Sequence, residues 1–131
     1  MNKVHEKYIR FKYPKIFSKV SIDCGDGWFD ILYELAGELE LVGKAAKIRV
    51  EASQVKEKFG TLRFYHSYIP VKKNPTHVVD KRWFDIVDSL IADAEHKSES
   101  TCERCGDYGI IRDAGWVRCL CDKCEAEKGK K

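Results

Sequence analysis

The chain contains 131 residues, and 44% of them are hydrophobic, which is enough for one compact core. Its formal net charge is only +3, so the total charge does not indicate a strongly basic nucleic-acid-binding protein. The sequence has no long apolar run, no signal peptide and no lipidation motif. We therefore expect a cytoplasmic protein that has no membrane partner and keeps its cysteines reduced, and no small-molecule substrate is evident.

The N-terminal segment is basic and interleaves lysines with aromatic residues. Such a segment can bind a phosphate backbone and stack on bases. The alternative is a partly extended leader in which Tyr8, Phe11, Ile16 and Phe17 pack on the core. We favour the leader because Pro14 interrupts any long helix.

A first amphipathic helix is predicted over residues 28–41, with Asp26 as its N-cap. One face is apolar, and an acidic row on another face is expected to be solvated. The apolar residues are Trp28, Ile31, Leu32, Leu35 and Leu39, and the acidic ones are Asp30, Glu34 and Glu38.

After this helix the apolar period changes to two, which predicts two antiparallel strands that meet at the turn Phe59-Gly60. The apolar parity slips near Ser53 and Gln54, which predicts a β-bulge. Residues 69–76 contain two prolines and are expected to form a loop.

A second amphipathic helix is predicted over residues 76–97, because apolar residues recur there at helical spacing from Val79 to Ala94. We expect this helix to pack across the hairpin. Residues 96–100 are polar and should form a hinge, with His96 facing solvent at the helix end.

The most specific pattern lies near the C-terminus, where Cys102 and Cys105 form one Cys-x-x-Cys pair and Cys121 and Cys124 form another. Two such pairs can complete the tetrahedron that zinc prefers, and four thiolates close the coordination sphere. The insert between the pairs predicts a β-hairpin clamped by the metal. We therefore predict a structural Zn²⁺ site in a zinc ribbon.

Two alternatives stand beside this prediction. Six cysteines could form disulfides, but a reducing compartment and the Cys-x-x-Cys spacing disfavour them. Cys119 lies two residues before Cys121 and could compete for the metal. We prefer Cys121 because only this residue recreates the Cys-x-x-Cys spacing with Cys124.

These elements predict an α+β fold in which two amphipathic helices pack on an antiparallel hairpin or small sheet, followed by a zinc ribbon. We expect residues 1–97 to form the body and residues 98–131 to form the ribbon with a charged, fraying tail. If only the polar hinge connects the two parts, metal removal should unfold the ribbon and leave the body folded.

The hairpin and the ribbon also carry candidate partner-binding side chains. A small cationic surface beside aromatic residues can contact a macromolecule. The alternative is an ordinary hairpin with a solvated face, in which Phe59 acts as an apolar plug. The candidates are Lys56, Lys58 and Arg63 on the hairpin and Arg112, Trp116 and Arg118 on the ribbon.

Three segments together resemble a family of small, mostly uncharacterised bacterial and bacteriophage proteins: CGDGW, QVKEKFGTLRFY and CERCG with GWVRCLCDKC. Members of this family pair an α/β body with a C-terminal zinc ribbon. The resemblance covers roughly residues 23–125 and implies that the four Cys-x-x-Cys cysteines are the metal ligands. It implies no established activity, and it would place a phage-encoded protein in the host cytoplasm.

Three hypotheses about function follow from the sequence. The first is a non-enzymatic zinc-binding interaction or regulatory protein with a protein partner, such as a host or defence macromolecule. The second is a nucleic-acid-binding zinc-ribbon protein, in which the basic residues contact phosphates. The third is a metal-dependent nuclease that uses Glu51, Lys56 and Asp26 or Asp30. We favour the first because no nucleophile-base pair and no open metal site emerges from the sequence.

Overall fold

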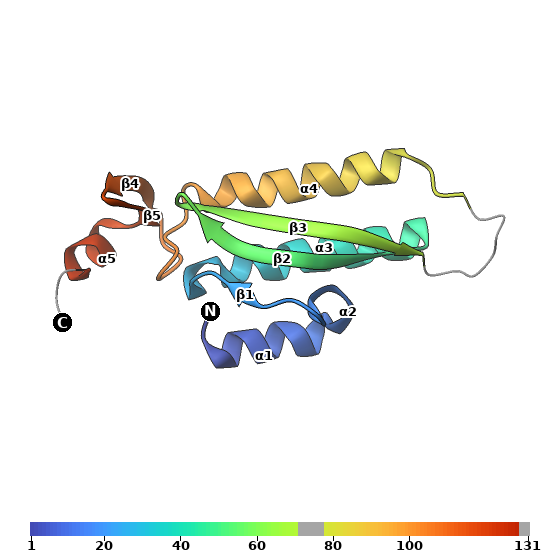
Figure 1. Cartoon of the computed structure of the whole chain (residues 1–131), viewed down its shortest axis with the longest axis horizontal. Coiled ribbons are helices and arrows are strands. Elements are labelled where there is room, and N and C mark those ends of the chain that lie inside the picture. Colours follow the sequence, from blue (N-terminus) through green and yellow to red (C-terminus); the bar gives the residue numbers. More distant parts are fainter. Residues whose placement is uncertain (71–77, 129–131) are drawn as a thin grey trace.

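Two long helices cover one face of a small sheet, so the fold is α+β as the sequence predicted (Figure 1). The computed structural model describes residues 1–70 and 78–128. The sheet has the order β1-β2-β3, with β1 parallel and β3 antiparallel to β2. The ribbon adds a separate antiparallel pair, β4-β5. The strands are β1 (Ile22–Asp23), β2 (Ile48–Lys58), β3 (Thr61–Pro70), β4 (Ile110–Ala114) and β5 (Trp116–Leu120), and the covering helices are α3 (Phe29–Ala46) and α4 (Arg82–Ser98).

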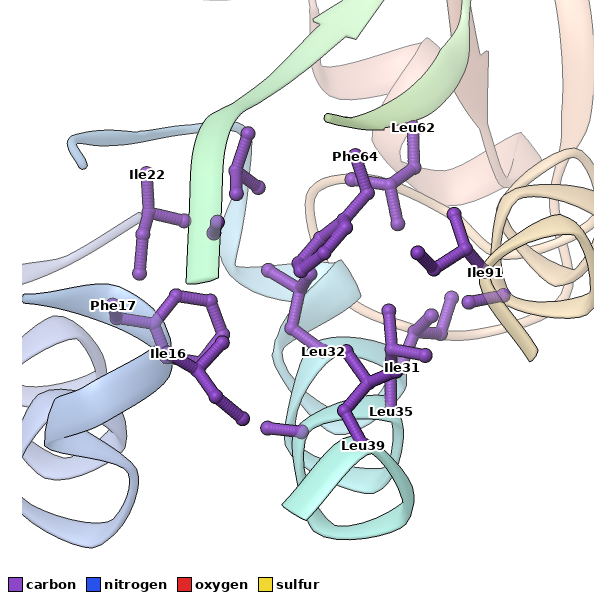
Figure 2. Packing of buried hydrophobic residues seen from close by; sticks show 14 of the residues in the cluster. Ile16, Phe17, Ile22, Ile31, Leu32, Leu35, Leu39, Leu62, Phe64 and Ile91 are labelled. Atoms are coloured by element: carbon purple, nitrogen blue, oxygen red, sulfur yellow. The ribbon is translucent and has the colours of Figure 1, made fainter. Parts of the chain in front are cut away.

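The core forms where alternate residues of β2 and β3 meet the apolar faces of α3 and α4. Figure 2 shows Phe64 reaching from β3 into the middle of this cluster. The ring of Phe17 meets that of Phe64 edge to face, with centroids 6.4 Å apart. On α3 the buried residues include Ile31, Leu32, Leu35 and Leu39, which is the apolar face that the sequence predicted.

The predicted hairpin and its bulge are confirmed. β2 and β3 pair antiparallel on either side of Phe59-Gly60, and the register shifts between Ala52 and Gln54. The bulge restores the apolar side of β2 to the core, because Ala52 and Val55 are both buried although they are three positions apart.

The predicted extended leader is wrong, because the N-terminal segment forms α1 (Lys3–Lys12) and α2 (Pro14–Phe17). The side chain of Asn2 caps α1 by accepting a hydrogen bond from the His5 amide. Pro14 occupies the first turn of α2, where its missing N–H costs nothing. Ile16 and Phe17 are buried as expected, whereas Tyr8 and Phe11 are exposed.

Asp26 serves a different purpose from the predicted helix cap. It lies in the 3₁₀ turn η1 (Asp26–Trp28), and its carboxylate accepts hydrogen bonds from the backbone and side chain of Asn2 and contacts His5. Burial acts to raise the pKa of Asp26, but the bonds from Asn2 and His5 outweigh it and lower the pKa. Asp26 therefore fastens the start of α1 to the rest of the body.

Helix boundaries also differ from the prediction, and α3 ends at Ala46 instead of residue 41. α4 begins at Arg82 instead of residue 76, and the expected loop at residues 69–76 falls mostly outside the described residues. The tail that was expected to fray instead begins with α5 (Asp122–Glu127), which Cys121 caps. In the described residues, no helix is long and apolar enough to cross a membrane.

The free edge of β3 is closed by side chains of α4. Ser98 is fully buried, so the expected hinge is not solvated at this position. Its hydroxyl accepts a hydrogen bond from the Leu62 amide at 2.8 Å and donates one to the carbonyl of Glu95 at 2.5 Å. The carboxylate of Glu95 accepts a bond from the Phe64 amide at 3.0 Å. These contacts satisfy two edge donors that would otherwise be available for pairing with another chain.

Replacing Ser98 by alanine should destabilise the protein by about 1–3 kcal/mol, because the buried Leu62 amide loses its acceptor. Urea unfolding measures this change. The control is Ser100→Ala, since Ser100 is exposed just after α4 and its hydroxyl bonds to the carbonyl of Lys97 in the last turn of that helix. Equal stability of the two variants would show that the Leu62 amide finds water instead.

Candidate functional site

The four cysteines of the two Cys-x-x-Cys pairs converge on one point. The sulfur atoms of Cys102, Cys105, Cys121 and Cys124 all lie within 4.8 Å of one another, and those of Cys105 and Cys121 are 3.6 Å apart. Tetrahedral zinc with Zn–S bonds of about 2.3 Å would hold its sulfurs about 3.8 Å apart, so the spacing fits such an ion. A disulfide needs sulfurs about 2 Å apart, and all six cysteines are free.

The local backbone aims these thiols inward. At the first pair, Gly106 adopts a φ of 87° and its amide donates to the carbonyl of Cys102, which closes the knuckle. At the second pair, Cys121 lies at the N-cap of α5 and its sulfur accepts a bond from the Cys124 amide at 3.4 Å.

The remaining two cysteines lie outside this cluster. Cys119 is fully buried, and its thiol donates to the carbonyl of Glu99 at 3.4 Å. Cys24 is also buried, and burial raises its pKa to about 12, so it remains a protonated apolar side chain. Within the described residues, the group with metal-binding spacing contains Cys121 and not Cys119.

The first knuckle is bound to the turn at residues 25–28 of the body. The indole of Trp28 donates to the carbonyl of Thr101 at 2.9 Å, and the Gly27 amide donates to the carbonyl of Glu103 at 2.7 Å. A Cβ atom at Gly27 would lie 1.9 Å from the carbonyl oxygen of Cys102, so only glycine permits this approach. The polar hinge is therefore not the sole connection between ribbon and body.

Glu103 adds a second layer to this junction. It is 6% exposed, its carboxylate accepts a bond from the Gly25 amide at 3.0 Å, and Arg118 lies 3.6 Å away. Arg118, a candidate partner-binding residue, thus has a charged partner inside the molecule. Arg112 is engaged similarly, because it donates to the carbonyl of Leu120 and to the carboxylate of Asp122 at 2.8 Å.

The candidates Lys58 and Trp116 both line a groove between the ribbon and the β2–β3 turn. The ribbon and this turn lie at the same end of the molecule (Figure 1). The groove has a volume of about 670 Å³. Trp116 is 73% exposed and Phe59 is 65% exposed, and both line the groove. The ammonium of Lys58 lies 5.6 Å from the centre of the Phe59 ring. We call this surface the aromatic groove: Glu57, Lys58, Phe59, Gly115, Trp116 and Val117.

Phe59 is the residue that the sequence interpretation placed wrongly, because it does not plug the hairpin. It adopts a φ of 54°, in the left-handed region that disfavours a bulky side chain, and Gly60 follows at 81°. Two-residue hairpin turns of this kind usually carry Asn-Gly. A phenylalanine at the position where such turns usually carry asparagine was the feature of the sequence that could have marked Phe59 as a candidate binding residue.

Lys56 and Arg63, the last two candidates, face each other across β2 and β3. Both are half-buried on the side of the hairpin opposite the core residues Val55 and Phe64. Like charges directly opposite each other on a sheet are unfavourable, although β1 brings Asp23 beside Lys56. The structure therefore places this pair away from the turn that lines the aromatic groove.

The three segments that carry the family resemblance all reach this end of the molecule. The turn at residues 25–28 touches the first knuckle, and a Cβ atom at Gly60 would lie 3.4 Å from side-chain atoms of Ile111 and Val117. Comparisons with protein-family models, with curated proteins and with solved structures found no match to this chain. The family resemblance therefore stays a prediction from the sequence.

The purified protein should contain about one metal ion per chain, which we expect to be zinc. Cys105→Ser should lose most of it because three thiolates leave the tetrahedron open, whereas Cys119→Ser should retain it because Cys119 lies outside the cluster. Elemental analysis after gel filtration measures both. Loss of zinc from Cys119→Ser, with Cys121→Ser unaffected, would contradict the assignment.

Metal removal should alter more than the ribbon. The indole N–H of Trp28 bonds to Thr101 beside the first knuckle, so chelation should move the NMR signals of both Trp116 and Trp28. Trp83, at the start of α4, should keep its signal. An unchanged Trp28 signal would show that the junction persists without metal, and collapse of all three would show that the metal supports the entire fold.

Proposed function

We propose that this chain is a non-enzymatic zinc-binding interaction protein, in which the metal holds the ribbon so that Trp116 and Phe59 form one docking surface for a partner protein. The observation that carries the proposal is the exposed, left-handed Phe59 beside the exposed Trp116. Zinc is the metal that best suits four thiolates at tetrahedral spacing. A sphere closed by four protein ligands supports a structural and not a catalytic ion.

The conformation of Phe59 supports a role in binding. A non-glycine residue in the left-handed region costs free energy, and the ring recovers little of that cost because most of it faces solvent. A partner that covers the ring and Trp116 would remove both from water. Large aromatic side chains in a central pocket supply most of the binding energy at many protein interfaces.

The charges around the aromatic groove are mixed, which favours a protein partner over a nucleic acid. Lys58 lies beside Glu57, and the nearby Arg118 is paired with Glu103. A phosphate backbone would meet both signs of charge here. The facing pair Lys56 and Arg63 favours nucleic acid as a second candidate.

Two of the three carboxylates invoked for a nuclease are engaged elsewhere, and the third, Asp30, is exposed on α3. Asp26 accepts hydrogen bonds from Asn2, and Glu51 is paired with Arg49 at 2.5 Å. A two-metal centre needs free carboxylates that converge. We therefore leave a nuclease out of the proposed function.

Replacing Phe59 by asparagine should raise stability and abolish partner binding together. Asparagine tolerates the left-handed conformation, so the free energy of unfolding should rise by about 0.5–1 kcal/mol. Binding should fall because the apolar ring is gone. Denaturant unfolding measures the first effect, and quantitative cross-linking of the captured partner measures the second.

Val78→Asn is the matched control, because Val78 is even more exposed, at 85%, and precedes α4, whose start lies at the end of the molecule opposite the aromatic groove (Figure 1). It should retain the partner. Capture is repeated after nuclease treatment, and a partner lost on that treatment would favour the nucleic-acid candidate. Equal capture by the wild type and the Phe59→Asn variant would refute the proposed docking surface.

A further inference from the structure

One face of α1 carries three exposed apolar or aromatic residues, and only Tyr8 among them stacks on another ring in the described part of the chain. Val4, Tyr8 and Phe11 are 75%, 49% and 83% exposed, and their spacing places them on one side of the helix. Ile9, on another side of α1, is fully buried in the core. Phe11 therefore projects from the surface as an isolated ring.

Exposed lysines lie on α1 beside this face and on the segment that follows α1. Five lysines of the N-terminal segment are exposed, and none of them forms an ion pair with the residues that the structure describes. The only acid in this segment, Glu6, is held by Arg10 at 3.2 Å. The five are Lys3, Lys7, Lys12, Lys15 and Lys19. The face thus combines an exposed aromatic ring with uncompensated positive charge.

A hollow lies beside it, between the end of α1 and the outer face of α3. It is open, has a volume of about 510 Å³ and has the rings of Tyr13 and Tyr33 in its wall. Gly37 contributes no side chain, and a Cβ atom there would lie 3.0 Å from the Tyr13 hydroxyl, so the hollow depends on this glycine. Its border is formed by five exposed residues: Lys12, Glu34, Glu38, Glu40 and Leu41. Glu34 and Glu40 are paired with Lys97 and Lys44, so Glu38 is the acid of this border with no ion pair in the described residues.

We propose that the chain forms a two-fold symmetric dimer in which Phe11 of each copy enters the hollow of the other. The face of α1 that carries Phe11 adjoins the hollow, since Tyr8 on that face stacks on Tyr33 in the wall of the hollow, with ring centroids 5.9 Å apart. Lys7, one helical turn before Phe11, and Glu38, at the hollow, have opposite charges. Neither forms an ion pair within the described residues. A surface that carries both halves of a complementary pair fits a second copy of itself.

Two-fold symmetry gives a charge-reversal test that few other arrangements allow. In the proposed dimer Lys7 of one copy faces Glu38 of the other. Lys7→Glu should weaken the homodimer because two carboxylates then face each other, and Glu38→Lys should weaken it because two ammonium groups do. We expect a loss of roughly tenfold or more in each case. An equimolar mixture of the two variants should regain the dimer, because both contacts of the mixed pair are again opposite in charge. Neither change breaks an ion pair in the described part of the monomer.

Sedimentation equilibrium at low salt measures the monomer–dimer constant of each variant and of the mixture. Phe11→Ala should also dissociate the dimer, whereas Phe59→Ala and Lys123→Glu, which change exposed residues far from α1, should not. Phe59 belongs to the aromatic groove and not to the proposed dimer contact. A failed dimer proposal would therefore leave the proposed function intact, and a failed proposed function would leave the dimer proposal intact. A monomeric wild-type chain, a dimer insensitive to Phe11→Ala, or a mixture that stays monomeric would each overturn the proposal. A monomer that binds oligonucleotides or another protein through Phe11 would do the same.

Discussion

The arrangement of this protein depends on the close approach between the turn at residues 25–28 and the first cysteine knuckle. Gly27 has no Cβ, so its amide can bond to Glu103 while its backbone lies against Cys102. Trp28 makes the same junction from the core side, because its indole bonds to Thr101 and its ring is fully buried. Geometry at the candidate metal centre is therefore transmitted directly to the main core.

This junction also explains how a small ribbon can take part in a composite surface. Trp116 lies on the ribbon and Phe59 on the body, and neither element alone contains the aromatic groove. A metal that closes the four-thiolate cluster would fix the ribbon hairpin and hence the position of Trp116. The proposed docking surface would therefore depend on the metal as well as on the left-handed turn at Phe59.

Several features follow from the sequence because they depend on local spacing. The two Cys-x-x-Cys pairs, the apolar face of α3 and the bulge near Gln54 are all written in short periodic patterns. The N-terminal helices were not, because Pro14 permits a helix to begin as readily as it ends one. The capping role of Asn2 also depends on the position of Asp26, which is remote in the sequence.

The sequence by itself determined the α+β class, the hairpin with its turn and bulge, and the two Cys-x-x-Cys pairs, because each depends on spacing between residues close together in the chain. Only the tertiary structure decided that Cys119 is buried away from the cluster and that Arg112 and Arg118 have partners inside the molecule. It also decided that Phe59 faces solvent beside Trp116. Burial and pairing are set by contacts between residues that are distant in sequence, and no local pattern records those contacts.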